Sequence, residues 1–416
     1  MRPLSLAFYA ALTGLAEPFA PVLLGRRAKA GKEDASRLAE RLGRSAIARP
    51  EGALVWLHGV SVGESVSLLP LVEALDQRGL NILVTSGTRT SAELLARRLP
   101  EGVIHQYAPI DAPATVRRFL DHWRPDTLIQ VESELWPNLI LGAKTQGAKL
   151  ALISARMTED SAKGWERAPR AARAVLQSFD LILPQDDETE GRLRRLGART
   201  GPRLNLKNVG SPLLCDEVEL GRLRSSIGER KVVLAASTHP GEEEIIARAA
   251  RGLDALLIVA PRHPDRGEAV GELLAKAGFV VARRSAGETP TEATTAYVAD
   301  TLGEMGLFYR LCDVAVMGGS FVPGVGGHNP MEPARLAVPI VTGPHVFNAA
   351  STYAEMFERV AAIECANEAI LTRDLKGLLT EPLIAPRIGR AAKAYADRQG
   401  AALDTALELL EPLLPA

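Results

Sequence analysis

The chain has few cysteines and no excess of charge of either sign. Its three cysteines, Cys215, Cys312 and Cys365, lie far apart and form no CxxC pair, which excludes a disulfide scaffold and a zinc ribbon and fits a reducing cytoplasm. Lysine and arginine number 49 against 50 acidic residues, so the chain lacks the basic excess that binds a phosphate backbone. We therefore expect no nucleic-acid partner.

Internal repeats and low-complexity tracts are also absent from the sequence. Hydrophobic residues make up 46% and charged residues 24% of the chain, which disfavours disorder, collagen and a polytopic membrane protein. At about 100 to 200 residues per domain, the length of 416 residues predicts two or three domains.

Residues 1–25 form an apolar segment that differs from this average. Its uncharged run, residues 4–16, is shorter than the about 20 residues that span a bilayer, and Pro18 and Pro21 follow it. A spanning helix, an interfacial anchor and a buried N-terminal helix therefore all remain open, whereas a cleaved signal peptide is disfavoured because the basic cluster follows the apolar run. We expect residues 1–25 to be a membrane anchor separable from the catalytic domains. Positive charge after it indicates the cytoplasmic side, and the charges concerned are Arg26, Arg27, Lys29 and Lys32.

From residue 53 onward, short apolar runs alternate with amphipathic stretches, which predicts repeated βα units and an α/β fold. A break over residues 200–229 separates two series, so we expect two Rossmann-like domains, residues 26–211 and 212–416, with ligands bound in a cleft between them. The expected strands are 53–57, 81–85, 127–131, 149–153 and 181–184, then 231–235, 255–259, 279–282, 314–317 and 339–341.

The glycine-rich segment 317–332 carries the densest signal. It follows an expected strand and precedes an expected helix, with Asn329 as its N-cap and Pro330 at its first position. Glycines there let backbone amides approach an anion, so we expect a nucleotide phosphate cradle. Glu332 either accepts hydrogen bonds from ribose hydroxyls or is a carboxylate that merely favours the N-terminus of the helix. The segment lacks the GKS/T of a P-loop and lies far from the first strand, which weakens ATPase and dehydrogenase interpretations.

Two further strand ends of the second half carry polar groups. Ser237 and Thr238 offer hydroxyl and amide donors after one strand, and Arg262 offers a planar fork for a phosphate or carboxylate after the next. His239 and His263 are as well explained by structural roles as by ligand contacts. The sequence contains no cluster of ligands typical of a metal site, so we expect neither a metal nor another cofactor.

Carboxylates follow two expected strands of the first half. Glu64 follows Gly59 and Gly63 and stands at the start of an expected helix. It is either a general base or a helix-start residue. Glu132 and Glu134 follow a later strand and could have separated pKa values or merely hold a loop.

With these residues assembled, the chain resembles 3-deoxy-D-manno-octulosonic acid (Kdo) transferases, the lipid A glycosyltransferases of Gram-negative bacteria, over nearly its whole length. The shared segments occur in the family's order and spacing: SVGES, ESELWPN, SARM, STHPGEE, PRHP, DTLGEMGLFY, and GGSFV followed by GGHNPMEP. The family's GNLK segment is matched at Leu204 to Lys207, with leucine in place of the glycine.

The resemblance implies a GT-B fold with a CMP-Kdo donor in the C-terminal domain and a lipid A precursor of the lipid IVA type in the N-terminal domain, at the cytoplasmic face of the inner membrane. It implies an inverting, metal-independent transfer with Glu64 as general base. For the acceptor region it implies acceptor-binding or structural roles for Ser61, Gly63, Glu132 and Glu134. For the donor it implies binding by Lys207, Ser237, Thr238, Arg262, His263, Gly318, Gly319, Ser320, Gly326, Gly327, His328, Asn329 and Glu332.

Two rival interpretations remain. Another GT-B protein, such as a sugar-nucleotide epimerase or an N-acetylglucosaminyl transferase, would share the glycine-rich segment and differ in binding UDP. A catalytically silent nucleotide-sugar binding protein would have no need of an acid at Glu64.

Overall fold

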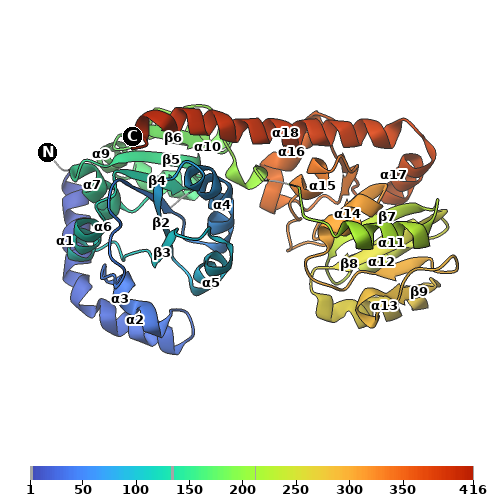
Figure 1. The fold of residues 1–416 in the computed structure, drawn as a ribbon. Coiled ribbons are helices and arrows are strands. Elements are labelled where there is room, and N and C mark those ends of the chain that lie inside the picture. Colours follow the sequence, from blue (N-terminus) through green and yellow to red (C-terminus); the bar gives the residue numbers. More distant parts are fainter. Residues whose placement is uncertain (1–2, 133–134, 211, 416) are drawn as a thin grey trace. The chain divides into compact units, whose positions relative to one another are not determined.

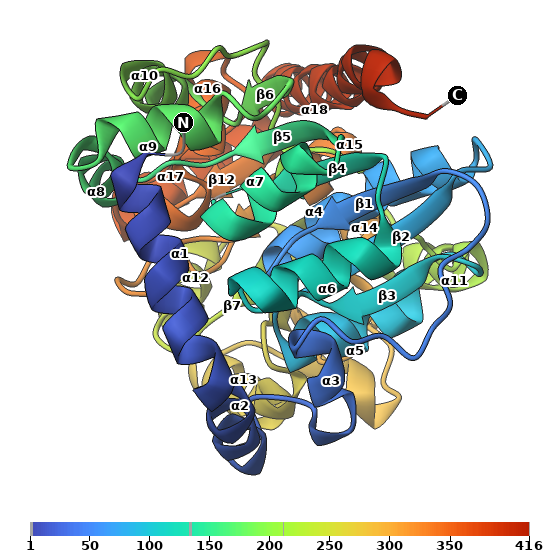
Figure 2. The same ribbon diagram turned by 90° about the vertical axis from the view of Figure 1, so that its left-hand side faces the viewer.

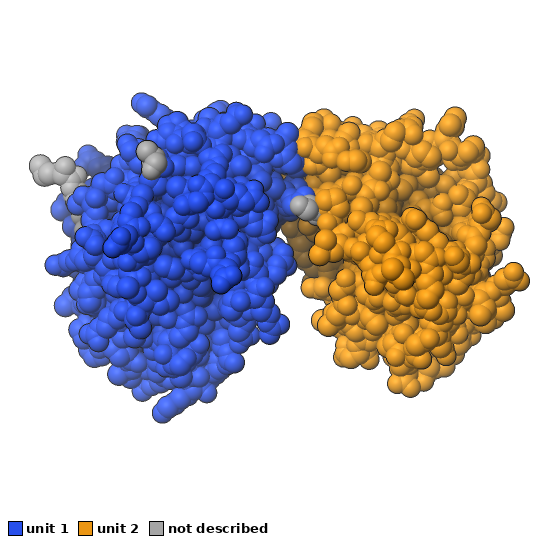
Figure 3. Space-filling view, in the orientation of Figure 1, with its two compact units in different colours: residues 1–210, 399–416 blue, residues 211–398 orange. Residues whose placement is uncertain are grey.

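The computed structural model describes residues 3–132, 135–210 and 212–415, which form two compact units. The first unit contains residues 1–210 and 399–416, and the second contains residues 211–398 (Figures 1 and 3). The chain thus divides after residue 210, and its end belongs to the first unit, whereas the sequence assigned everything after residue 211 to the second domain.

The first unit is built on a parallel six-stranded sheet of order β3-β2-β1-β4-β5-β6. Alternate residues of β1 face opposite sides, so that Leu54 and Trp56 pack into one core and Val55 and Leu57 into another. Both faces are therefore covered by helices, as parallel sheets require. The strands are β1 (Leu54–His58), β2 (Asn81–Ser86), β3 (Ile104–Tyr107), β4 (Thr127–Val131), β5 (Lys149–Ala155) and β6 (Leu181–Pro184).

Helices connect these strands and cover the sheet, as the alternating pattern predicted. They are α3 (Leu38–Arg41), α4 (Val62–Asp76), α5 (Arg89–Arg98), α6 (Pro113–Trp123), α7 (Pro137–Thr145), α8 (Glu159–Glu166), α9 (Pro169–Leu176) and α10 (Asp187–Arg195), with the short 3-10 helices η2 (Ala35–Arg37) and η3 (Leu206–Asn208).

The second unit has a parallel seven-stranded sheet of order β13-β12-β11-β7-β8-β10-β9. Its strands are β7 (Lys231–Thr238), β8 (Ala255–Pro261), β9 (Val281–Arg283), β10 (Ala296–Val298), β11 (Val314–Met317), β12 (Ile340–Thr342) and β13 (Ile363–Glu364). Its helices are α11 (Glu217–Ile227), α12 (Glu242–Ala250), η4 (Pro264–Arg266), α13 (Gly267–Lys276), η5 (Arg284–Ala286), α14 (Met305–Leu311), α15 (Met331–Arg335), η6 (Phe347–Ala349), α16 (Ala350–Glu358) and α17 (Glu368–Thr380).

The last long helix, α18 (Ile384–Leu410), contributes residues to both units. In its final turns Ala406, Leu407 and Leu410 are buried in the same core as Val55 and Leu57 of β1, and η7 (Glu411–Leu413) follows. Burial of these three side chains explains why the chain end belongs to the first unit.

The N-terminal segment forms α1 (Leu4–Ala16), η1 (Glu17–Phe19) and α2 (Ala20–Lys29), which follow one another along one side of the first unit beside α6 (Figure 2). Together they are long enough and apolar enough to cross a membrane, by length and composition. One face is nevertheless docked on the unit. Leu6 is buried, the Tyr9 hydroxyl donates to Asp111 at 3.0 Å, and Glu17 pairs with Arg118 at 3.1 Å.

The opposite face of this segment is exposed and apolar. Phe8 is 71% exposed and Leu15 is 75% exposed. The exposed residues recur at helical spacing, three or four residues apart. We call this face the apolar stripe, and it consists of Leu4, Phe8, Leu12, Leu15, Phe19, Val22 and Leu23.

Candidate active site

Glu64 lies in the first turn of α4, directly beyond the carboxyl end of β1. The Ser61 hydroxyl accepts a hydrogen bond from the Glu64 amide at 3.3 Å and donates to Glu64 Oε1 at 3.0 Å, while the Val60 amide donates to Glu64 Oε2 at 2.6 Å. Ser61 therefore caps α4, and the Glu64 side chain reaches back to the residue before the cap, so Glu64 does act as a helix-start residue. The same contacts fix a carboxylate that is only 6% exposed at the strand-end edge of the sheet.

Lys207 and Glu132 form an ion pair beside the start of α4. Lys207 Nζ pairs with Glu132 Oε1 at 2.7 Å, and the Glu132 backbone has a positive φ of 59°. A side chain added at Gly63 would lie 4.0 Å from Lys207 Cε, which places the lysine stem beside the start of α4. The structure therefore brings Ser61, Gly63, Glu64, Glu132 and Lys207 together, whereas Glu134 lies outside the described residues.

The leucine that replaces the family's glycine causes no backbone conflict. Leu204 is not among the residues with positive φ, and its side chain is buried in the core that also holds Leu206. The position therefore has no need of a glycine, and η3 still presents Lys207 at the surface.

In the second unit, the backbone amides of the glycine-rich loop donate hydrogen bonds to the side chain of Glu242. Its fully buried carboxylate accepts from the backbone amides of Gly319 (2.6 Å), Ser320 (2.8 Å) and Phe321 (2.8 Å), and from His239 (3.0 Å). The expectation that Gly319 and Ser320 give amides to a donor phosphate is therefore wrong, because an internal carboxylate already takes the place of that anion.

The glycines of this loop are needed for close packing. The Gly318 amide donates to the Ala236 carbonyl, and a Cβ at Gly318 would lie 2.4 Å from the Ser237 carbonyl oxygen. A Cβ at Gly326 would lie 2.4 Å from the Phe347 ring, and the Gly327 amide donates to Gly319. Gly318 and Gly327 thus have internal partners as well, and the amide cradle predicted from the sequence needs this correction.

The helix after the loop is shorter than expected. α15 has five residues, Pro330 occupies the N-cap position, and Asn329 Oδ1 accepts from the Met331 amide at 3.0 Å. Pro330 thus precedes the helix rather than opening it. One helical turn provides little dipole for a phosphate.

Three strand ends of this unit bring polar side chains to one edge of the sheet. Ser237, with a positive φ of 57°, lies near the end of β7 and His239 follows that strand, Arg262 and His263 follow β8, and His328 lies in the loop after β11. Arg262 and His263 are exposed.

Thr238 is committed to the interior instead. Its hydroxyl donates to Glu243 Oε1 at 2.9 Å, and the same carboxylate pairs with Arg266 at 2.7 Å; Thr238 and Glu243 are both buried. The expected contact between the Thr238 hydroxyl and the donor is therefore not supported.

Two titratable groups near this edge have shifted pKa values. Burial lowers the pKa of His328 to about 4, helped by His239 and Arg262. Burial raises the pKa of the Glu332 carboxyl, opposed by Arg335 and Arg262, so Glu332 is a half-buried acid close to Arg262. Within the described ranges, no group of three or more His, Cys, Asp or Glu could hold a metal ion.

Sequence reasoning missed Glu242 and Glu243 as organising residues. The available signal was the segment STHPGEE, in which two acids follow a glycine directly after a strand. Acids there were indistinguishable from ordinary first-turn carboxylates.

Comparisons with known proteins agree with this architecture. Residues 36–209 match the 3-Deoxy-D-manno-octulosonic-acid transferase (kdotransferase) family. A 3-deoxy-D-manno-octulosonic acid transferase of Haemophilus influenzae is 33% identical over 423 residues, which cover 98% of each chain. A probable mitochondrial 3-deoxy-D-manno-octulosonic acid transferase of Arabidopsis thaliana is 37% identical over 355 residues, 81% of this chain and 79% of that protein.

Solved structures with low identity share the fold. A glycosyltransferase from Rickettsia africae is 11% identical with a TM-score of 0.59, over 88% of this chain and 99% of that one. A UDP-GlcNAc 2-epimerase from Neisseria meningitidis is 12% identical with a TM-score of 0.56, over 86% of this chain and 100% of that one. The two parallel-sheet units are those of a GT-B protein, and the full-length identities show that this chain belongs to the Kdo transferase family of glycosyltransferases.

Proposed function

We propose that the protein transfers Kdo from CMP-Kdo to a lipid A precursor of the lipid IVA type, with inversion and without a metal ion. The observation that carries the proposal is the fixed Glu64 carboxylate at the strand-end edge of the first unit, in a chain that belongs to the Kdo transferases. A primary hydroxyl of the acceptor attacks the anomeric carbon of Kdo, and CMP departs.

Glu64 acts in this proposal as the general base. Hydrogen bonds from the Val60 amide and the Ser61 hydroxyl hold its carboxylate in one orientation, which suits a group that must meet an incoming hydroxyl within hydrogen-bond reach. The capping role and the catalytic role are compatible because a carboxylate has about four acceptor sites.

Lys207 contributes positive charge beside this base. Its ammonium pairs with Glu132 and its side chain remains about two-fifths exposed (41%), so it can also meet an anionic group of the substrates. Glu132 then serves as a positioning residue that holds the lysine near the start of α4.

Donor binding belongs to the second unit in this proposal. Arg262 and the neighbouring histidines supply donors for the phosphate, and Glu332 supplies an acceptor for ribose hydroxyls. The transition state resembles an oxocarbenium ion while charge builds on the departing phosphate, so Arg262 favours it electrostatically.

The N-terminal segment lies in the membrane interface rather than across the bilayer. A segment that spans the bilayer would have to leave its partners on the first unit, Asp111 for Tyr9 and Arg118 for Glu17, and would carry Glu17 into hydrocarbon. Docked as it is, the segment presents the apolar stripe to lipid, and the cations at the end of α2 favour anionic headgroups of the inner membrane's cytoplasmic face.

The test is a transfer assay with the full chain, CMP-Kdo and a lipid A precursor in detergent with EDTA, with products identified by mass. Glu64→Gln is expected to lower kcat by about 10²- to 10⁴-fold, because a general base is lost. CMP affinity, measured by calorimetry, and the thermal melt should stay close to wild type.

Two matched variants separate catalysis from capping. Ser61→Ala removes the cap hydroxyl but keeps the carboxylate. It should lower the free energy of unfolding by about 1 kcal/mol and should reduce kcat much less than Glu64→Gln does. Glu93→Gln changes an exposed acid of α5 and should behave as wild type. Near-normal turnover in Glu64→Gln would rule out the base, and UDP-dependent chemistry without Kdo transfer would favour the epimerase-like alternative.

A further inference from the structure

Two histidines from different strand ends of the second unit face each other. The Nε2 atoms of His239 and His328 are 3.0 Å apart, and their rings are nearly parallel, with an interplanar angle of 15° and centroids 5.2 Å apart. His263 packs against His239 edge-on, with ring centroids 6.1 Å apart. Both facing rings are half-buried, so they are partly shielded and still reachable.

The contact between the two rings requires opposite tautomers. Because the two Nε2 atoms are 3.0 Å apart, one of them must donate and the other must accept in the neutral pair. In the part of the chain that the structure describes, His239 Nδ1 has no hydrogen-bond partner, so the pair has one open site for a proton.

Burial, together with neighbouring positive charge, lowers the pKa values of both rings and favours a neutral pair when no ligand is bound. Burial is the main cause that lowers the pKa of His239, with further lowering by His263, Arg262 and Arg266, while Glu242 raises it. Glu242 cannot approach the rings, because its carboxylate is fully buried and already accepts from backbone amides. Burial, His239 and Arg262 lower the pKa of His328 in the same way.

We propose that His239 and His328 act as one proton-carrying pair, which takes up a proton when the donor's phosphate binds beside Arg262 and delivers it to the departing phosphate oxygen. This inference rests on the proposed function and adds catalytic residues to it. A phosphate anion stabilises an imidazolium, so the donor itself brings the charge that the empty site lacks. In the protonated pair, the ring-to-ring contact becomes a charge-assisted hydrogen bond.

The step balances in atoms and electrons. The bond between the Kdo anomeric carbon and the phosphate oxygen breaks, and its electron pair goes to that oxygen, which receives the proton from the pair. The new bond forms between the anomeric carbon and the acceptor oxygen, whose own proton goes to the base. The pair takes its proton from solvent when the next donor binds, and the base returns its own proton to solvent after transfer, so no oxidant, reductant or metal is needed.

Proton uptake on CMP binding tests the proposal without relying on turnover. Calorimetric titrations of the full chain with CMP near pH 7, in buffers of different ionisation enthalpy, give the number of protons taken up. Wild type is expected to take up a large part of about one proton for each CMP bound. His239→Asn and His328→Asn should each take up much less. CMP's own phosphate titrates near pH 6 and contributes equally to every protein, so the difference reports the pair.

Further variants make the outcome specific. His122→Asn removes a histidine of the first unit, which lies near the Ile47 carbonyl and the Trp123 ring, and should keep the full uptake. His239→Gln and His328→Gln keep a hydrogen-bonding amide and replace the asparagine variants if those melt at lower temperature. In the transfer assay, loss of either ring should lower kcat by about 10²- to 10³-fold.

The outcomes separate this proposal from the function on which it rests. Wild-type proton uptake and wild-type kcat in the histidine variants would overturn the pair while leaving Kdo transfer intact. Failure of the wild-type chain to bind CMP would instead overturn the proposed donor.

Discussion

Glu242 holds the glycine-rich loop of the second unit by its backbone. Four amides converge on its two oxygen atoms, all within 2.6–3.0 Å, and the side chain is fully buried. Such a buried charge is stable only because its hydrogen bonds are complete. The loop therefore has its shape before any ligand binds, and His239 and Gly319 are positioned by the same carboxylate.

Glu242→Gln should destabilise this unit. The amide group replaces one acceptor oxygen by a donor that faces backbone N–H groups, so we expect a loss of about 2–5 kcal/mol in the free energy of unfolding and weaker CMP binding. Thermal melts and CMP calorimetry would measure both, with the exposed Glu268→Gln as control. An unchanged melt and an unchanged CMP affinity would show that the loop does not depend on this carboxylate.

The residues of the candidate site could be predicted by position more readily than by role. The position of Glu64 at the end of a strand could be predicted from the sequence, because it stands directly between an expected strand and an expected helix. The occupant of the loop amides could not be predicted, since Glu242 lies 77 residues before Gly319 and only the folded sheet brings them together.

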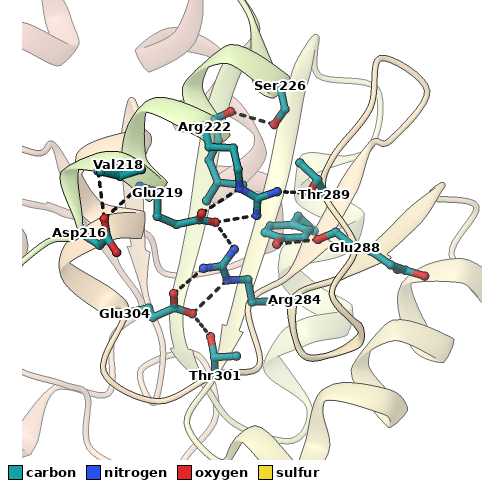
Figure 4. Close-up of polar contacts among 12 residues, drawn as sticks. Asp216, Val218, Glu219, Arg222, Ser226, Arg284, Glu288, Thr289, Thr301 and Glu304 are labelled. Atoms are coloured by element: carbon teal, nitrogen blue, oxygen red, sulfur yellow. Dashed lines mark hydrogen bonds and ion pairs between the residues drawn. The ribbon is translucent and has the colours of Figure 1, made fainter.

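At the scale of elements, an ion-pair network joins α11, η5 and the segment before α14. Arg284 pairs with Glu219 and with Glu304, the latter at 2.5 Å, and Arg222 pairs with Glu219 at 2.8 Å (Figure 4). Two guanidinium groups therefore share one carboxylate, and Thr301 donates to Glu304 at the far end.

This network predicts a defined acid sensitivity. Hydrogen bonding from Arg222 and then from Arg284 lowers the pKa of Glu219 from 4.5 to about 2. A folded-state pKa below the unfolded value stabilises the fold above pH 4.5, and that contribution is lost as the pH falls towards 2. Glu219→Gln should therefore lower the melting temperature at pH 7, and its difference from wild type should shrink as the pH falls below 4.5.

Thermal melts between neutral and acidic pH would measure this difference, with the exposed Glu292→Gln as control. A difference between wild type and Glu219→Gln that stays constant across the acidic range would show that the network does not stabilise the unit electrostatically.

Strands could be predicted where their residues are apolar and branched. Expected and observed bounds coincide for β4, β6 and β11, which are short runs of mainly Val, Ile and Leu. β3, β10 and β13 were missed. β3 has the sequence IHQY, β10 has three residues and β13 has two, so neither apolar content nor length distinguishes them from loops. Their place at or near sheet edges comes from pairing with neighbours, which periodicity cannot indicate.

At the scale of the whole molecule, the N-terminal segment belongs both to the first unit and to the proposed membrane surface. The sequence predicted a separable anchor, but Leu6, Tyr9 and Glu17 pack or bond onto the unit, so deleting residues 1–25 would uncover that surface. Truncation would therefore mix loss of the membrane contact with damage to the fold. Substitutions on the apolar stripe avoid this problem, because its side chains are exposed.

Phe8→Asp and Leu15→Asp should each weaken binding to vesicles about ten-fold or more, since an aromatic or aliphatic side chain leaves the lipid and a charge replaces it. Their melting temperatures and CMP affinities should match wild type, whereas Leu6→Ala on the docked face should lower the melting temperature and leave the stripe intact. Co-sedimentation with vesicles that contain or lack anionic phosphatidylglycerol would measure the binding and its dependence on the cations of α2. Transfer to acceptor in bilayers should fall in the stripe variants more than transfer to detergent-dispersed acceptor, because only the first requires the protein at the surface. Wild-type vesicle binding in both stripe variants would show that the segment is a structural helix and that another surface meets the membrane.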